Sequence, residues 1–183
     1  MLFDLIKNRR SVFPAQYNDQ PIAKETIEKV LEAANWAPSH RKTEPWRFKV
    51  LQGESKEKLG LFLSLKYLEN DASPKEFKAK KIIQNPKSAA AVIAICMQRD
   101  PEESVPEWEE VAAVAMAVQN MWLMCTELGI GAYWSSPGLI KYMGEFFEMN
   151  RGEVCLGFFY MGNYDEKVSD AVRMPLEDKV DWL

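Results

Sequence analysis

The sequence has few of the residues on which metal and disulfide sites depend. It contains one histidine, His40, and three cysteines, an odd number, spaced about thirty residues apart in stretches that we expect to be buried. A single histidine excludes the zinc motifs that need two, and the cysteine spacing does not support a disulfide framework or a Cys-x-x-Cys site. We therefore expect no metal centre and a reducing, cytoplasmic environment.

Signals for membranes, secretion and nucleic acid are also missing. No apolar run of about eighteen residues occurs, because Gln119 and Asn120 interrupt the longest candidate, and residues 1–10 are too charged for a secretory signal. With 27 acidic and 23 basic residues the net charge is −4, so the basic excess typical of nucleic-acid-binding proteins is absent. The sequence predicts a soluble protein with no nucleic-acid or membrane partner.

Three common catalytic fingerprints are absent as well. Gly129 and Gly131 begin a Gly-x-Gly pattern, but Trp134 occupies the third glycine position, so the dinucleotide-binding fingerprint fails. Neither a Gly-x-x-x-x-Gly-Lys-[Ser/Thr] phosphate loop nor a Gly-x-Ser-x-Gly nucleophile elbow occurs. These absences disfavour a Rossmann dehydrogenase, a P-loop enzyme and an α/β-hydrolase.

The chain is rich enough in apolar residues to fold as one domain over residues 1–183. Of its 183 residues 47% are hydrophobic, so no disulfide or metal is needed for folding. Alternating or continuous apolar runs predict strands, and apolar residues at helical spacing predict helices. We expect strands over 46–51, 89–97, 131–134 and 153–162, and helices over 1–10, 23–36, 55–67, 75–84, 108–128 and 140–148. Because these elements do not alternate strictly, they indicate an α+β fold, a sheet with helices on its faces.

Two segments carry more apolar surface than their own packing explains. The expected helix 108–128 is apolar over most of its circumference, so it is either central or at a subunit interface. The tail 163–183 has no periodicity yet ends in Trp182 and Leu183. We expect both segments to be covered, within the chain or by another chain.

Two arginines and a serine follow the first helix. Arg9 and Arg10 could hold a phosphate through bidentate, charge-assisted bonds, with Ser11 adding a hydroxyl. The simpler interpretation is that the arginines complement a helix C-terminal dipole and lie in solvent.

Two loops form further candidate sites. The basic loop 38–46 begins with Pro38, Ser39 and His40, and it is either a binding loop or an ordinary exposed connection. The second loop, 133–138, has Trp134, Ser135 and Ser136 at its centre. Its backbone amides could face a planar ligand. A tight turn anchored in the core by an aromatic side chain explains this sequence equally well.

Taken in chain order, these clusters resemble the nitroreductase family of flavoproteins. The resemblance rests on Arg9-Arg10-Ser11, on residues 37–40 leading into 44–48, on the loop 134–138, and on residues 173–177, which are similar to the family's arginine-proline-leucine tail. It covers essentially the whole chain.

The resemblance implies an intertwined homodimer with a mixed, mainly antiparallel sheet and two FMN sites, each built from both chains. It implies that Arg9, Arg10 and Ser11 bind the FMN phosphate and ribityl chain, with a further contact from Arg173. By the same resemblance, the loop with Pro38, Ser39 and His40 comes from the partner chain. Trp134, Ser135 and Ser136 would lie along the isoalloxazine, with a backbone amide near Ser136 facing N5.

The implied activity is an FMN-dependent oxidoreductase with a ping-pong mechanism. NADH or NADPH would deliver a hydride to FMN, and a small-molecule electron acceptor such as a nitroaromatic or quinone would then be reduced. Because the flavin carries the redox chemistry, no side chain needs to act as a nucleophile. This agrees with the absence of a catalytic triad or carboxylate pair.

Several residues depart from the family pattern. Phe13 stands where many members carry a basic residue, and Arg41 or Lys42 could substitute for it. Thr43 and Glu44 replace the usual asparagine and glutamine, and His40 suggests a small histidine-bearing subgroup. Two alternatives therefore stay open: a protein that stores or senses flavin with little turnover, and a dimerising α+β module without a cofactor.

Overall fold

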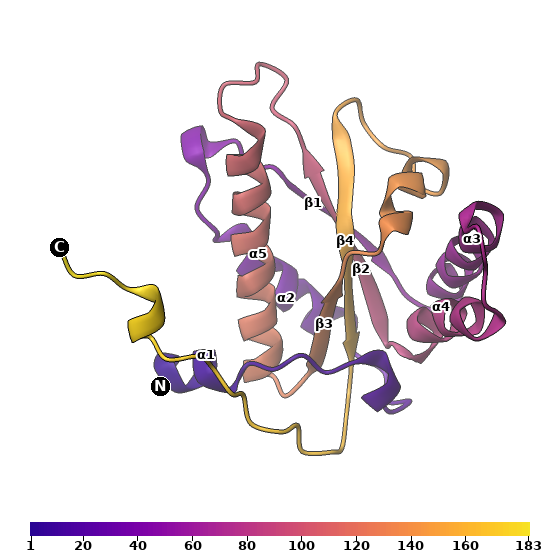
Figure 1. Ribbon diagram of the computed structural model, residues 1–183, viewed down its shortest axis with the longest axis horizontal. Coiled ribbons are helices and arrows are strands. Elements are labelled where there is room, and N and C mark those ends of the chain that lie inside the picture. Colours follow the sequence, from indigo (N-terminus) through magenta and orange to yellow (C-terminus); the bar gives the residue numbers. More distant parts are fainter.

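A four-stranded sheet forms the centre of the computed structural model, which describes residues 1–183 (Figure 1). The strands are β1 (Trp46–Leu51), β2 (Ala91–Gln98), β3 (Gly131–Ser135) and β4 (Glu153–Gly162). Their order is β1-β2-β4-β3, and all three pairings are antiparallel. The predicted α+β fold with a mainly antiparallel sheet is therefore confirmed, and every predicted strand is present.

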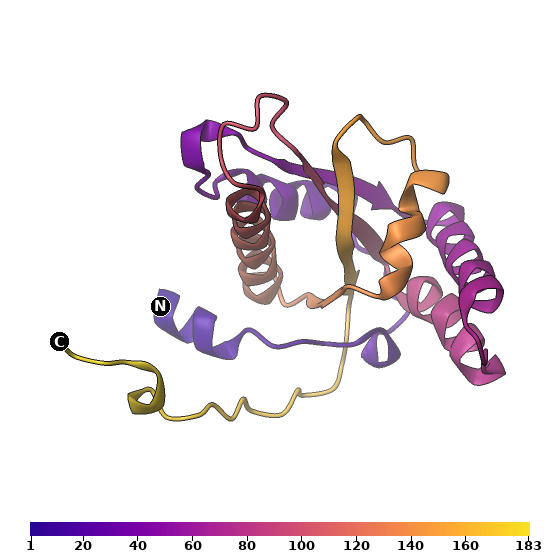
Figure 2. The same cartoon turned by 45° about the horizontal axis from the view of Figure 1, so that its top comes forward.

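Helices cover both faces of the sheet. The α-helices are α1 (Leu2–Asn8), α2 (Lys24–Asn35), α3 (Glu54–Asn70), α4 (Glu76–Ser88) and α5 (Glu107–Glu127). Short 3₁₀ helices follow at η1 (Pro14–Gln16), η2 (His40–Lys42), η3 (Gly138–Glu145) and η4 (Glu177–Lys179). Figures 1 and 2 show α2 and α5 on one side of the sheet, with α3, α4 and η3 on the other.

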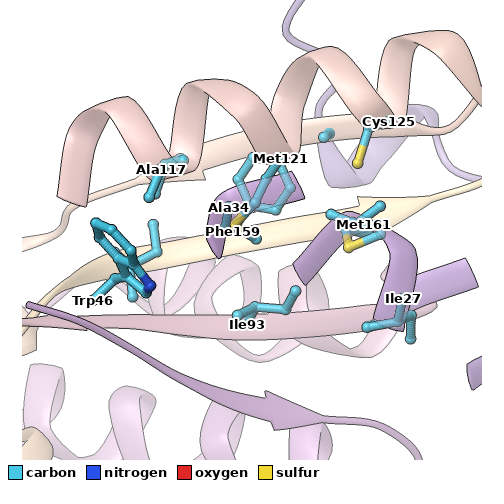
Figure 3. Close-up of a cluster of buried hydrophobic side chains, with 14 of the residues drawn as sticks. Ile27, Ala34, Trp46, Ile93, Ala117, Met121, Cys125, Phe159 and Met161 are labelled. Carbon is cyan, nitrogen blue, oxygen red and sulfur yellow. The ribbon is translucent and has the colours of Figure 1, made fainter. Parts of the chain in front are cut away.

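Each face of the sheet has its own hydrophobic core. In the first core, Met121 and Cys125 of α5 and Ile27 of α2 pack against Ile93 and Phe159 of the central strands (Figure 3). The second core lies under α3 and η3 and includes Val92 and Ala94 of β2. Neighbouring residues of β2 thus point into different cores, which explains why its sequence is a continuous apolar run rather than an alternating one.

Two predicted helices end or wind differently in the structure. The helix expected over 75–84 continues through Pro86 to Ser88, because a proline in the last turn removes only one backbone N–H and the bonds before it remain. The helix expected over 140–148 is the 3₁₀ helix Gly138–Glu145. It contains two glycines, Gly138 and Gly144, which lower helix propensity and favour a short, tight winding.

The C-terminal segment extends away from the rest of the chain. After β4 it runs past α1, and both views show it projecting into open space (Figures 1 and 2). Trp182 is 94% exposed, and Val172, Met174 and Leu176 are exposed too. The sequence predicts that this tail is covered either by its own chain or by another chain. These residues are not covered by their own chain. Elsewhere, none of the helices combines the length and the hydropathy that crossing a bilayer requires.

Candidate flavin site

The arginine segment leaves α1 and lies between the end of α5 and the start of β3. The backbone N–H of Val12 donates to the carbonyl of Ala132 at 3.0 Å, and Trp122 Nε1 donates to the carbonyl of Arg10 at 3.1 Å. The Arg9 guanidinium lies 4.6 Å from the centroid of the Trp122 ring, a cation–π contact. These contacts fix Arg9, Arg10 and the adjacent Ser11 against the body of the protein.

Three guanidinium groups gather here without an anion. Burial, together with the nearby charges of Arg173 and Arg10, lowers the pKa of Arg9. None of the three arginines takes part in any ion pair of the chain. The Nη1 atom of Arg10 is buried and has no hydrogen-bond partner. Because buried polar groups are nearly always paired, this arrangement fits a phosphate dianion that accepts bidentate hydrogen bonds.

The aromatic loop at the end of β3 lies against a bulge in β4. Trp134 packs on the first core, and its buried indole Nε1 has no hydrogen-bond partner. A Cβ atom added at Gly157 would lie 2.3 Å from this Nε1, so the indole can occupy its place only because residue 157 is glycine. The loop then continues through Ser135 and Ser136, which are half-buried and exposed.

A cavity of about 360 Å³ opens beside this loop, between η3 and the helices α3 and α4. Ser135 and Gly138 line one side of it. The other lining groups include three tyrosines and three lysines: Tyr67, Tyr142, Tyr160, Lys66, Lys78 and Lys141. The sequence does not predict these residues as site residues, because they lie on four separate elements whose patterns indicate only packing. The fold brings them together around one cavity.

Aromatic rings connect the arginine segment with this cavity. The Phe13 and Tyr133 ring centroids are 4.6 Å apart, and those of Tyr133 and Tyr160 are 6.3 Å apart. Phe13, which departs from the family pattern, is thus part of a surface that leads from the arginines to the cavity wall. A planar ring with a phosphorylated side chain fits such a surface chemically.

The His40 loop is tied to the opposite end of α5. His40 Nδ1 lies 2.5 Å from Glu109 Oε2, in the first turn of the helix. The loop is strained, since Arg41, Lys42 and Glu44 have φ angles of 52°, 57° and 42°. Non-glycine residues in this conformation cost about 1–3 kcal/mol each and cluster at binding sites.

One chain does not bring all the predicted site residues together. Arg9 contacts α5 at Trp122, whereas His40 contacts it at Glu109, so about 20 Å of helix separates the two groups. Figure 1 shows α1 near one end of α5 and the loop before β1 near the other. A chain therefore unites Arg9, Arg10, Ser11 and Arg173 with the β3 side, and leaves Pro38, Ser39 and His40 apart.

Comparisons with known proteins identify relatives of this chain. A profile of the nitroreductase family matches residues 6–163. YdjA of Escherichia coli strain K12, whose provisional name is NAD(P)H nitroreductase, is 27% identical over 175 residues, 94% of this chain and 93% of YdjA. A crystal structure of a nitroreductase-like family protein from Bacillus cereus has a TM-score of 0.87 at 28% identity, covering 100% of this chain and 96% of that one.

A more distant crystal structure shares the fold alone. It is a mutant of the FMN and NADPH-dependent nitroreductase NfnB from Sphigopyxis sp. strain HMH, with a TM-score of 0.80, 17% identity, and coverage of 100% of this chain and 98% of that one. The family profile spans most of the residues from α1 to the end of β4, which carry the arginine segment, the His40 loop and the β3 loop. By sequence and by fold, this chain belongs to the nitroreductase family.

Proposed function

We propose that this FMN-dependent NAD(P)H oxidoreductase works by a two-step, ping-pong reaction with a small electron acceptor. When bound, FMN supplies the redox chemistry, taking a hydride from NADH or NADPH and passing it to an acceptor such as a nitroaromatic or a quinone. The observation that carries the proposal is the cluster of three arginines that has no anion within the chain. The name of the relative YdjA supports the nicotinamide donor.

The residues of this chain bind and orient the cofactor. Arg9, Arg10 and Arg173 hold the phosphate, with the Ser11 hydroxyl beside it. The β3 loop, through Trp134, Ser135 and a backbone amide near Ser136, lies along the ring. Since the side chains supply position and charge rather than a nucleophile, the rate depends on how well they are preorganised.

One lysine of the cavity, Lys141, provides the positive charge that Phe13 cannot. Lys66 is already paired with Glu145 at 2.6 Å, and Lys78 is 3.8 Å from Asp71. Lys141 forms no ion pair and lies 5.0 Å from the centroid of the Tyr142 ring. Because it lines the same cavity as Ser135 and Gly138, Lys141 is a stronger candidate than Arg41 or Lys42 of the same chain for stabilising a reduced, anionic ring.

A homodimer completes each site. The outward face of α5 exposes Trp108, Val111 and Met116, and the tail exposes Trp182 and Leu183. Large exposed apolar side chains that gather on one surface are typical of protein interfaces. In a twofold dimer, the His40 loop of one chain can reach the arginine cluster of the other, which makes one site from two separated groups.

Anaerobic reduction tests the activity. We expect purified protein to be yellow, to lose its flavin absorbance on addition of NADH or NADPH, and to regain it when a nitroaromatic or quinone is added. Initial rates at several acceptor concentrations should give parallel double-reciprocal lines, the pattern of ping-pong kinetics. A yellow protein that does not bleach at a useful rate would instead support flavin storage, and a preparation that stays colourless after dialysis against FMN would contradict both.

A further inference from the structure

Two cysteines face each other across the central strands. Cys96 of β2 and Cys155 of β4 are register partners, and the register shifts between Ile95 and Cys96. Ile95 pairs with Gly157, so Leu156 is the extra residue of a β-bulge next to Cys155. Both thiols belong to the second core, and all three cysteines of the chain are free. Directly opposite residues of antiparallel strands have Cβ atoms about 4.5–5.5 Å apart, close to what a disulfide needs.

The two thiols belong to a buried polar chain. The Cys96 thiol is hydrogen-bonded to Cys155 and to the Glu153 carboxylate. Lys49 Nζ lies 2.7 Å from Glu153 Oε1, and the Cys155 thiol donates to the Gly157 carbonyl at 3.5 Å. The hydrogen bond with Cys96 lowers the pKa of Cys155, whereas that bond and burial raise the pKa of Cys96. Cys155 is therefore the sulfur that ionises first.

Exposure to solvent also differs between the two residues. Cys155 is 9% exposed, whereas Cys96 is fully buried. We therefore expect a small oxidant to reach Cys155 before Cys96, its register partner on β2. Cys125 is buried on the opposite face of the sheet, in the first core, and so serves as an unpaired reference thiol.

We propose that Cys96 and Cys155 are a thiol pair that closes to a cross-strand disulfide when the protein meets a peroxide. Cys155 attacks hydrogen peroxide, which forms a Cys155 sulfenic acid and releases one water. Cys96 then attacks the sulfenic sulfur, a sulfur–sulfur bond forms, and hydroxide leaves. The Cys96 proton passes through the Glu153 carboxylate to that hydroxide and gives the second water. In sum, two thiols are oxidised and one peroxide is reduced to two waters.

Thiol counting on the FMN-loaded protein tests this assignment. The protein is treated with graded hydrogen peroxide, quenched, unfolded and alkylated, and the labelled thiols are counted by mass spectrometry. We expect the count to fall from three to one per chain, with a linked peptide pair that contains Cys96 and Cys155. Dithiothreitol should restore all three thiols.

Variants separate this pair from general oxidation. In Cys125→Ala the count should fall from two to none. In Cys155→Ser both remaining thiols should survive the same peroxide dose. In Cys96→Ser, which serves if the first variant does not fold, Cys155 should be oxidised without forming a linked peptide, and only the Cys125 thiol should remain. In the natural chain, three thiols that persist, a Cys155 sulfinic acid without a linked peptide, or a disulfide that includes Cys125 or joins two chains would overturn the proposal. The thiol count does not depend on turnover, so it stands or falls separately from the proposed oxidoreductase activity.

Discussion

At the residue scale, the most informative feature is positive charge held together without a counter-ion. Burial, together with the nearby charges of Arg173 and Arg10, disfavours the charge of Arg9. This arrangement costs free energy in the empty chain, and a bound dianion offsets that cost. The arginine cluster thus favours binding of an anion and does not stabilise the fold of the empty chain.

Removing two of these charges should release the cofactor. We expect Arg9→Ala combined with Arg173→Ala to weaken FMN binding, because each lost charge-assisted hydrogen bond contributes about 1.5–3 kcal/mol, or roughly 10- to 150-fold in affinity. Quenching of FMN fluorescence measures the dissociation constant. Arg151→Ala, an exposed arginine away from the cluster, is the control. Unchanged flavin occupancy in the double variant would show that the phosphate lies elsewhere.

The contact between Gly157 and Trp134 gives a second prediction at this scale. Gly157→Ala places a methyl group 2.3 Å from the Trp134 Nε1, so the indole or the bulge has to move. We expect a loss of about 1–3 kcal/mol of unfolding free energy and a change in the near-ultraviolet circular dichroism. Gly144→Ala is the matched control, since a Cβ there meets nothing within 4 Å. Equal stability of the two variants would contradict the prediction.

At the scale of elements, the sequence predicts what periodicity controls and misses what three-dimensional proximity controls. The strands 46–51 and 153–162 are predicted with the bounds that the structure has, because burial on one or both faces dictates their residue pattern. The 3₁₀ winding of Gly138–Glu145 has no such pattern. Likewise, Arg9 and Arg10 stand out in a short motif, whereas Lys66 and Lys141 meet only through folding.

The ion pair that ties β1 to β4 should make stability depend on pH. Burial of Glu153 opposes its ionisation, but hydrogen bonds from Lys49 and the Asn150 backbone N–H outweigh burial and leave its pKa below the usual 4.5. A carboxyl group with a lowered folded-state pKa stabilises the protein above its unfolded pKa, and this contribution is lost as the pH falls through the folded value. The contribution is therefore full above about pH 5 and fades in the range below about pH 4.5.

Urea unfolding at a series of pH values tests this dependence. We expect Glu153→Gln to be less stable than the natural chain at neutral pH, and the difference to shrink on acidification from about pH 5 to about pH 3. Glu28→Gln, on the exposed face of α2, should leave the pH profile unchanged. A stability gap that stays constant over this range would show that Glu153 does not carry the effect.

At the scale of the whole molecule, the outward face of α5 exposes apolar side chains that we expect a partner chain to cover. Met116→Glu places a charge in the middle of this face. Burying an unpaired charge costs about 3–5 kcal/mol, so the variant should elute as a monomer in size-exclusion chromatography with light scattering, whereas we expect the natural chain to elute as a dimer. Met116→Leu keeps the apolar volume and should remain dimeric. A dimeric Met116→Glu protein would place the interface elsewhere.

The placement of Arg9 and His40 at opposite ends of α5 has a genetic consequence, intragenic complementation. When chains carrying Arg9→Ala and Arg173→Ala are refolded together with chains carrying His40→Ala, each hybrid has one doubly damaged centre and one intact centre. Random pairing should then restore about a quarter of the natural activity from two inactive parents. Parents that stay inactive after mixing would mean that each chain works with its own His40. Because α5 separates Arg9 from His40 within one chain, we expect a complete site to form only between two chains.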